Sequence, residues 1–148
     1  MALDFGTRRI GVAVSDGLGL TAQGLPTLER SRMAEDLGRI QALAGEYAVE
    51  RVVVGNPISA KGAETAMSRR VAEFVEKLQR RLPCPIELWD ERLTSVQANR
   101  MLRESGIGIE KRRRAVDRVA ATLLLESYLD FCAHRSRSAG DAEGGAAS

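Results

Sequence analysis

The order in which hydrophobic patterns follow one another constrains the fold of this chain most strongly. Near the N-terminus, apolar residues alternate with polar or small ones in three stretches, at residues 2–5, 10–14 and 20–28. Such alternation is typical of β-strands, and the short connections between the stretches favour antiparallel hairpins. Gly24 and Pro26 interrupt the third stretch, so we expect an edge strand or a bulge there.

After this region the pattern changes to helices and strands in turn. Apolar residues recur at helical spacing over 37–47 and 67–82, and Ser31 can cap the first of these helices. The runs 51–54 and 86–89 have the composition of strands. Thr94 and Gln97 form a capping box for a further helix, and a last helix is expected over about 111–133. The sequence thus predicts an α/β fold, in which a mixed five-stranded sheet, three antiparallel strands then parallel strands, is flanked by helices on both faces.

The length of 148 residues fits a single domain, which we expect to span residues 1–134. Residues 135–148 contain no large apolar side chain, so we expect them to form a flexible tail. No apolar run approaches the roughly 20 residues that span a bilayer, and no leader-like segment opens the chain. A cytoplasmic protein without membrane association is expected.

Positive charge is concentrated in one segment, although the formal net charge of the chain is only +2. Residues 92–118 contain eight basic and three acidic residues, which leaves the rest of the chain with a net charge of −3. A basic patch of this kind attracts polyanions through phosphate neutralisation and counterion release. It is equally compatible with a solvated helix face.

Carboxylates follow the ends of two predicted strands. Asp4 ends the first strand, and Asp90 and Glu91 follow the run 86–89. A charge next to a sheet core needs a partner, a metal ion or access to water. Asp4 could instead be a turn residue, and Asp90 and Glu91 could serve as N-terminal charges of the following helix.

Asp117 is the most informative acid, because Ala120, Ala121, Leu124 and Tyr128 follow it at helical spacing. It therefore lies on the packed face of the last helix, where it requires a cation, hydrogen-bond donors or a metal ion. A salt bridge to a nearby arginine is the structural alternative. If the acids of the strands and the helix converge, their oxygen ligands suit Mg²⁺ or Mn²⁺, and two such ions can hydrolyse a phosphodiester.

At these residues the sequence resembles a known family. The resemblance rests on residues 4–16, on Gly55, Asn56 and Pro57 with Gly62, on residues 90–95, and on residues 111–117 with Ala120 and Ala121. These segments are similar to the YqgF/RuvX family of Holliday-junction-resolvase-like proteins, which are associated with maturation of the 5′ end of pre-16S ribosomal RNA. Only three residues precede Asp4, fewer than in most relatives, so a short first strand or a start site further upstream is expected.

The resemblance implies an RNase H-like fold and a cytoplasmic nuclease that uses Mg²⁺ or Mn²⁺. It assigns Asp4, Glu91 and Asp117 as catalytic metal ligands, with Asp90 as a candidate fourth acid. The substrate would be nucleic acid, with RNA favoured, on ribosomal precursor particles, and branched DNA as the alternative. Both a monomer and a homodimer are compatible with it. The expected substrate-binding residues are Gly6, Thr7, Arg8, Arg9, Asn56, Arg92, Lys111, Arg112, Arg113 and Arg114.

Two other functions compete with a nuclease. The segment from Asp4 to Thr7 is similar to the first phosphate loop of actin-like ATPases, but the chain has room for only one of the two domains that close around ATP. A non-catalytic nucleic-acid-binding protein could use the basic segment alone. It would gain nothing from acids that face a phosphate, so replacing them should strengthen binding, whereas in a nuclease replacement should abolish cleavage.

Overall fold

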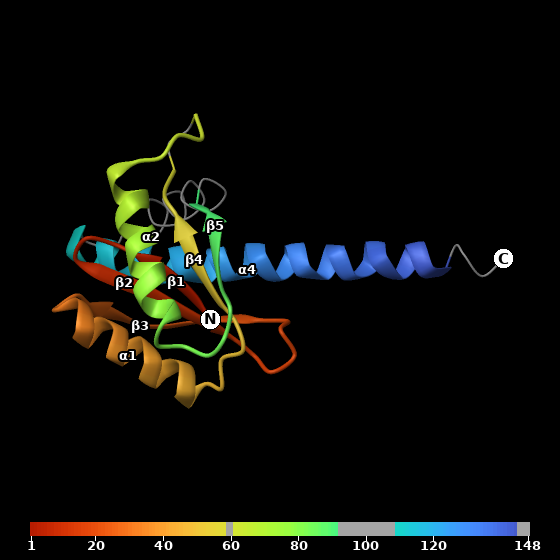
Figure 1. The fold of residues 1–148 in the computed structure, drawn as a ribbon, viewed down its shortest axis with the longest axis horizontal. Helices are drawn as coiled ribbons and strands as arrows, with labels where there is room; N and C mark the ends of the chain where they lie inside the picture. The colour runs from red at the N-terminus through yellow and green to blue at the C-terminus, as the bar shows by residue number, and fades with distance from the viewer. Residues whose placement is uncertain (59–60, 92–108, 145–148) are drawn as a thin grey trace.

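A five-stranded sheet forms the centre of the protein (Figure 1). The computed structural model describes residues 1–58, 61–91 and 109–144, and, within the last range, the side chains of residues 118–140. The strand order is β3-β2-β1-β4-β5, with β2 antiparallel to β1 and β3, and β4 parallel to β1 and β5. The predicted mixed sheet is therefore confirmed. Its strands are β1 (Ala2–Phe5), β2 (Arg9–Ser15), β3 (Ala22–Glu29), β4 (Val52–Asn56) and β5 (Ile86–Asp90).

The first two strands form a hairpin whose tight turn depends on Gly6. The Gly6 N–H donates a hydrogen bond of 2.8 Å to the Arg9 carbonyl oxygen. A Cβ atom at position 6 would lie 2.7 Å from that oxygen, a distance that real Cβ atoms do not show. At the other side of β2, the register with β3 shifts between Ile10 and Val12. The expected irregularity near Pro26 is thus a bulge in an edge strand.

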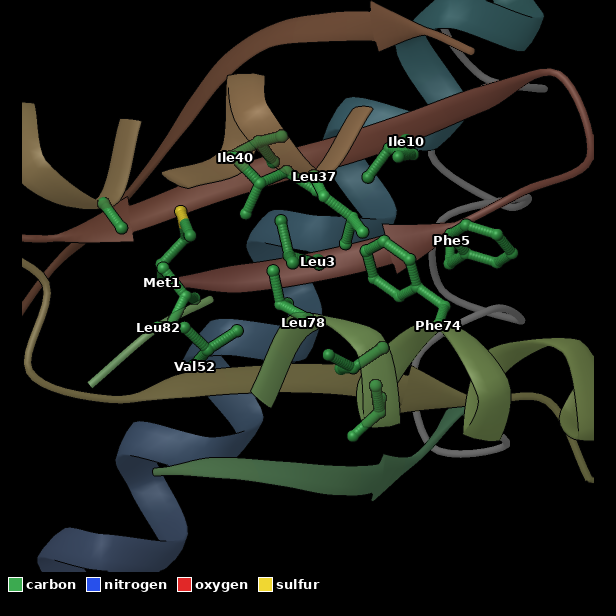
Figure 2. Close-up of a cluster of buried hydrophobic side chains, with 14 of the residues drawn as sticks. Met1, Leu3, Phe5, Ile10, Leu37, Ile40, Val52, Phe74, Leu78 and Leu82 are labelled. Atoms are coloured by element: carbon green, nitrogen blue, oxygen red, sulfur yellow. The ribbon is translucent and has the colours of Figure 1, made fainter. Parts of the chain in front are cut away.

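Two helices, α1 (Met33–Glu46) and α2 (Ala66–Gln79), cover one face of the sheet (Figure 1). The larger of the two hydrophobic clusters lies beneath them, and Figure 2 shows Leu3 and Phe5 of β1 pointing toward side chains of both helices. Phe5 stacks on Phe74 of α2, with 4.4 Å between the ring centroids. Because strand side chains alternate between faces, Ala2 and Asp4 belong to the opposite face of β1.

The long helix α4 (Ile109–Gly144) covers that opposite face. The second hydrophobic cluster lies there, and it joins Ala2 and Ala13 of the sheet to Ala121, Leu124 and Leu125 of α4. Helices therefore lie on both faces, as the sequence predicts. The helix is longer than predicted at both ends, and its C-terminal part projects past the sheet (Figure 1). Residues 133–140 are exposed. The division into a domain and a tail at residue 134 stays a prediction.

The start of α1 differs from the prediction that Ser31 caps it. The helix has Arg32 at its N-cap, and this residue makes no side-chain capping bond. Instead, Asp36 within the helix accepts a hydrogen bond of 3.0 Å from the Ser31 N–H, so the acid binds the chain that precedes the helix. The predicted capping box at Thr94 lies outside the described residues. Among the described residues, no helix has the combination of length and hydrophobicity that a membrane span requires.

Candidate functional site

The candidate site lies at the carboxyl ends of β1, β4 and β5, on the face of the sheet that α4 covers. Asp4 is on this face because its strand neighbours Leu3 and Phe5 both belong to the cluster under α1 and α2. Glu91 follows the last residue of β5, and Trp89, two positions before it, packs in the cluster with α4. Asp4 and Glu91 thus come from strands that flank β4 on either side.

Gly55 of β4 provides the space in which these two carboxyl groups meet. A Cβ atom on Gly55 would lie 3.0 Å from the Oε1 atom of Glu91 and 3.3 Å from its Cδ atom. The Glu91 side chain therefore lies directly against the backbone of β4, and its carboxyl group is hydrogen-bonded to that of Asp4. A larger residue at position 55 would compete with Glu91 for this place. The contact between two acids so distant in the sequence depends on the glycine between them.

The electrostatics of this pair are those of two acids in contact at a partly buried place. Burial raises the pKa of the Asp4 carboxyl well above its usual value of 3.8, and the hydrogen bond that protonated Asp4 makes to Glu91 and the negative charge of Glu91 raise it further. Removing two carboxylates from water and placing them in contact is unfavourable unless a proton or a cation compensates. The pair can therefore hold a proton or a positively charged ligand.

Asp90 occupies a different place from Glu91. It is the last residue of β5 and pairs in register with Asn56, the last residue of β4. By strand alternation it shares the face of Leu88 and Ile86 rather than that of Trp89. Both Asp90 and Asn56 are partly buried. Glu91, the next residue along the chain, contacts Asp4.

The loop 6–9 lies directly after β1, beside Asp4. Thr7 and Arg8 are exposed, whereas Gly6 and Arg9 are partly buried at the ends of the turn. The exposed side chains of Thr7 and Arg8 offer a hydroxyl group and a guanidinium group, which are suitable donors to a phosphate. The loop thus lies next to Asp4 in the fold, and its role in substrate binding stays a prediction.

Asp117 belongs to α4, but its side chain lies outside the described part of the structure. Its position in the helix is in phase with Ala121, Leu124 and Tyr128, which are all buried. Helical phase thus places position 117 on the face of α4 that covers the sheet. The side chains of Arg92, Lys111, Arg112, Arg113 and Arg114 are also outside the described residues. Arg118 is the one basic residue of the segment 92–118 whose side chain is described, and it is exposed.

The chemistry of Asp4 and Glu91 fits a divalent cation. Carboxylate oxygens are the hard ligands that Mg²⁺ and Mn²⁺ prefer, and a cation would offset the repulsion that raises the pKa of Asp4. Among the side chains that the structure describes, no three acids, histidines or cysteines gather closely enough to hold a metal ion. The third expected ligand, Asp117, is outside that set.

Sequence reasoning misses one residue next to the site and the place of another. Gly55 is among the residues that carry the family resemblance, but its position in β4, where it makes room for Glu91, is not predicted. Arg30 is absent from the predicted site, although its Nη1 atom donates hydrogen bonds to the carbonyl oxygens of Gly6 and Thr7. The short apolar segment 52–54, which ends at a glycine, is the sequence feature that draws attention to Gly55. Nothing in the local sequence connects Arg30 to a loop more than 20 residues earlier.

Comparison with known proteins finds a matching family and similar sequences over most of the chain. The RuvX family model, described as Holliday junction resolvase, matches residues 1–131. A protein of Koribacter versatilis named "Putative pre-16S rRNA nuclease" is 47% identical over 130 residues, which cover 88% of this chain and 85% of that protein. Proteins of the same name from Clostridium novyi and Myxococcus xanthus are 45% and 44% identical, and the matches cover 88% and 91% of this chain and 96% and 88% of theirs.

A solved RuvC structure from Thermus thermophilus is also similar, with a TM-score of 0.44 and 18% identity, over 82% of this chain and 89% of that one. The family match extends over the whole sheet and most of α4. The strand order confirms the mixed five-stranded sheet expected from the sequence, and the RuvX family match covers all of it. This chain belongs to the RuvX family.

Proposed function

We propose that this RuvX-family protein is a divalent-metal-dependent nuclease that acts in the cytoplasm on the 5′ end of pre-16S ribosomal RNA. The observation that carries the proposal is the contact between the Asp4 and Glu91 carboxyl groups across Gly55. Two acids in contact are unfavourable in a protein that only binds nucleic acid, because they repel both each other and phosphate. They are useful where a cation must be held next to a phosphodiester.

In this proposal Asp4, Glu91 and Asp117 hold Mg²⁺ or Mn²⁺. Such ions would polarise a phosphate oxygen as Lewis acids. They would also lower the pKa of a water molecule, so that hydroxide is available near neutral pH to attack phosphorus. The protein itself then needs no nucleophilic side chain. Its acids fix the position of the cations, and the partly buried setting of Asp4 strengthens their attraction to positive charge. Asp90, on the other face of β5, contributes no metal ligand in this arrangement.

The loop 6–9 and the basic segment bind the substrate backbone in this proposal. Thr7 and Arg8 are exposed next to Asp4, at a place where they can donate to phosphate oxygens. Asn56 ends β4 between the two strands that carry the acids, and its amide can also donate. The remaining basic residues supply sequence-independent affinity that decreases with salt. They are Arg9, Arg92, Lys111, Arg112, Arg113 and Arg114.

Resolution of branched DNA is the second candidate function, because the matching family model carries the description Holliday junction resolvase. The two functions differ in substrate and in assembly. A symmetric four-way junction favours a two-fold dimer, whereas trimming an RNA end requires only one protomer. We favour RNA because the curated relatives with 44–47% identity carry the name of an RNA nuclease.

The test is cleavage of a labelled 5′-extended pre-16S RNA fragment and of a four-way DNA junction by the purified protein, with Mg²⁺, Mn²⁺ or EDTA. Wild type should cleave the RNA with either metal and fail to cleave it in EDTA. Asp4→Asn and Asp117→Asn should lose cleavage. Asp130→Asn, an exposed acid in the same helix as Asp117, serves as the matched control and should retain it. Cleavage of the junction but not of the RNA would favour the second function, and equal activity in all variants would refute the site.

A further inference from the structure

Arg30 connects three parts of the protein that meet beside the candidate site. It follows β3, and its own backbone N–H donates a hydrogen bond of 2.8 Å to the Arg8 carbonyl oxygen. Its Nη1 atom donates to the carbonyl oxygens of Gly6 at 3.3 Å and Thr7 at 3.4 Å. The guanidinium group lies over the ring of Phe5, 4.3 Å from the centroid, and the side chain is 20% exposed.

Asp36 of α1 anchors this arginine from the other side. Its side chain is completely buried, and its Oδ2 atom lies 3.6 Å from Nε of Arg30. Burial alone would raise the pKa of the Asp36 carboxyl, but hydrogen bonds from the Ser31 N–H and from Arg39 outweigh this effect and lower it. Asp36 therefore stays ionised near neutral pH and can hold the Arg30 guanidinium in one orientation.

Together these contacts engage all four carbonyl oxygens of the loop 6–9. Those of Gly6 and Thr7 accept from the Arg30 side chain, that of Arg8 accepts from the Arg30 backbone, and that of Arg9 accepts from the Gly6 N–H. A carbonyl oxygen carries partial negative charge and would repel a phosphate. With these oxygens held by donors within the protein, the exposed Thr7 and Arg8 side chains are left to face an anionic substrate.

We propose that Arg30 is a positioning residue, which holds the carbonyl oxygens of the loop 6–9 away from the nucleic-acid backbone and thereby fixes the loop beside Asp4. This inference rests on the proposed nuclease function. Arg30 does not contact the substrate. It acts through the loop, so its loss affects substrate binding more than the metal ligands.

Arg39 provides a matched control, because it also pairs with Asp36 but its other hydrogen bond goes to the Glu29 carbonyl oxygen. Arg30→Met and Arg39→Met each remove one arginine from the same buried acid, and only the first releases the loop. For Arg30→Met we expect KM for the RNA to rise roughly tenfold, with Mg²⁺ dependence unchanged. For Arg39→Met we expect KM within about twofold of wild type.

Hydrogen exchange of individual amides, followed by NMR, tests the positioning role without any substrate. The Gly6 and Arg30 amides both bond within the loop and should exchange faster in Arg30→Met than in wild type and Arg39→Met. If Arg30→Met does not fold, Arg30→Lys replaces it as the test variant. Lysine keeps a positive charge near Asp36 but lacks the planar guanidinium group, whose N–H donors can reach two carbonyl oxygens. Arg30→Lys should fold and show the same faster exchange.

Chemical rescue separates positioning from a general loss of stability. Millimolar ethylguanidinium should restore RNA affinity to Arg30→Gly, and ethylammonium should not, because only the former can reach two carbonyl oxygens at once. Two results would overturn the proposal. One is equal exchange and equal KM in the Arg30 and Arg39 variants. The other is a decrease of about one in the salt slope of binding in Arg30→Met, which would make Arg30 a direct phosphate ligand.

Failure of the proposed function would give a different result. If wild type cleaves neither RNA nor junction, the nuclease assignment fails, and the exchange measurement still decides whether Arg30 holds the loop. If wild type cleaves and the exchange rates do not change in the Arg30 variants, only the positioning role fails.

Discussion

Asp4→Asn should make the metal-free protein more stable while it removes nuclease activity. In the folded protein the Asp4 carboxyl is partly buried and hydrogen-bonded to that of Glu91, so its pKa is raised well above 3.8. A group of this kind contributes stability that is present below its unfolded pKa and is lost as pH rises through its folded pKa. Near pH 8 the wild type therefore carries an unfavourable charge pair that the variant lacks.

The size of the gain follows from the contact. Two unit charges about 4 Å apart repel by about 4 kcal/mol at an effective dielectric constant of about 20. The wild type avoids part of this cost by binding a proton or by moving Glu91, so we expect a gain of about 1–2 kcal/mol in the free energy of unfolding. For a chain of 148 residues, that corresponds to a rise of roughly 3–6 °C in Tm.

The assay is thermal unfolding in EDTA between pH 4 and pH 8, with Asp130→Asn as the control for removing one exposed negative charge. The difference between Asp4→Asn and wild type should be small near pH 4 and should grow toward pH 8. Added Mg²⁺ should raise the Tm of wild type and leave that of Asp4→Asn unchanged. An Asp4→Asn variant less stable than wild type at pH 8 in EDTA would refute the reasoning.

Three further predictions concern the space beside Glu91, the core and the basic segment. Gly55→Ala places a methyl group 3.0 Å from Oε1 of Glu91, so cleavage should fall roughly 10–100-fold, whereas Gly17→Ala, with no neighbour within 4 Å of the new Cβ, should cleave normally. Phe74→Ala should cost about 3–5 kcal/mol in urea unfolding, because Phe74 is fully buried and stacked; a cost below about 1 kcal/mol would contradict this core. Replacing Arg112, Arg113 and Arg114 by Gln should lower the salt slope of binding to single-stranded RNA by about 0.7 for each phosphate that the protein no longer neutralises, and an unchanged slope would exclude that role.

Much of the fold was predictable because it depends on patterns that are local in the sequence. Alternation over residues 10–14 is sufficient to identify β2, and the helical spacing of Leu37, Ile40 and Ala44 gives the buried face of α1. The predicted cap of α1 is wrong because Ser31 interacts with acids of the helix instead. Asp36 binds the Ser31 N–H, and the Ser31 hydroxyl donates to Glu35 rather than to the helix backbone.

From the sequence, the residues of the candidate site could be named, but their arrangement in space could not be predicted. Strand ends suggest Asp4 and Glu91, but the sequence does not say that β4 separates their strands or that Gly55 leaves room between them. The choice between Asp90 and Glu91 as a metal ligand stays a prediction; strand alternation adds only that Asp90, the last residue of β5, shares the face of Leu88 rather than that of Trp89. Arg30 could not be found because its contacts join segments that only the tertiary fold brings together. The role of Asp117 stays a prediction.

The most direct test of the central claim is a Mn²⁺ titration of the purified protein, followed by electron paramagnetic resonance of the free ion. Wild type should bind Mn²⁺, Asp4→Asn and Glu91→Gln should each decrease the affinity at least about tenfold, and Asp90→Asn should bind as wild type does. Mn²⁺ affinity that is unchanged by Asp4→Asn or Glu91→Gln would contradict the assignment of these two acids as metal ligands.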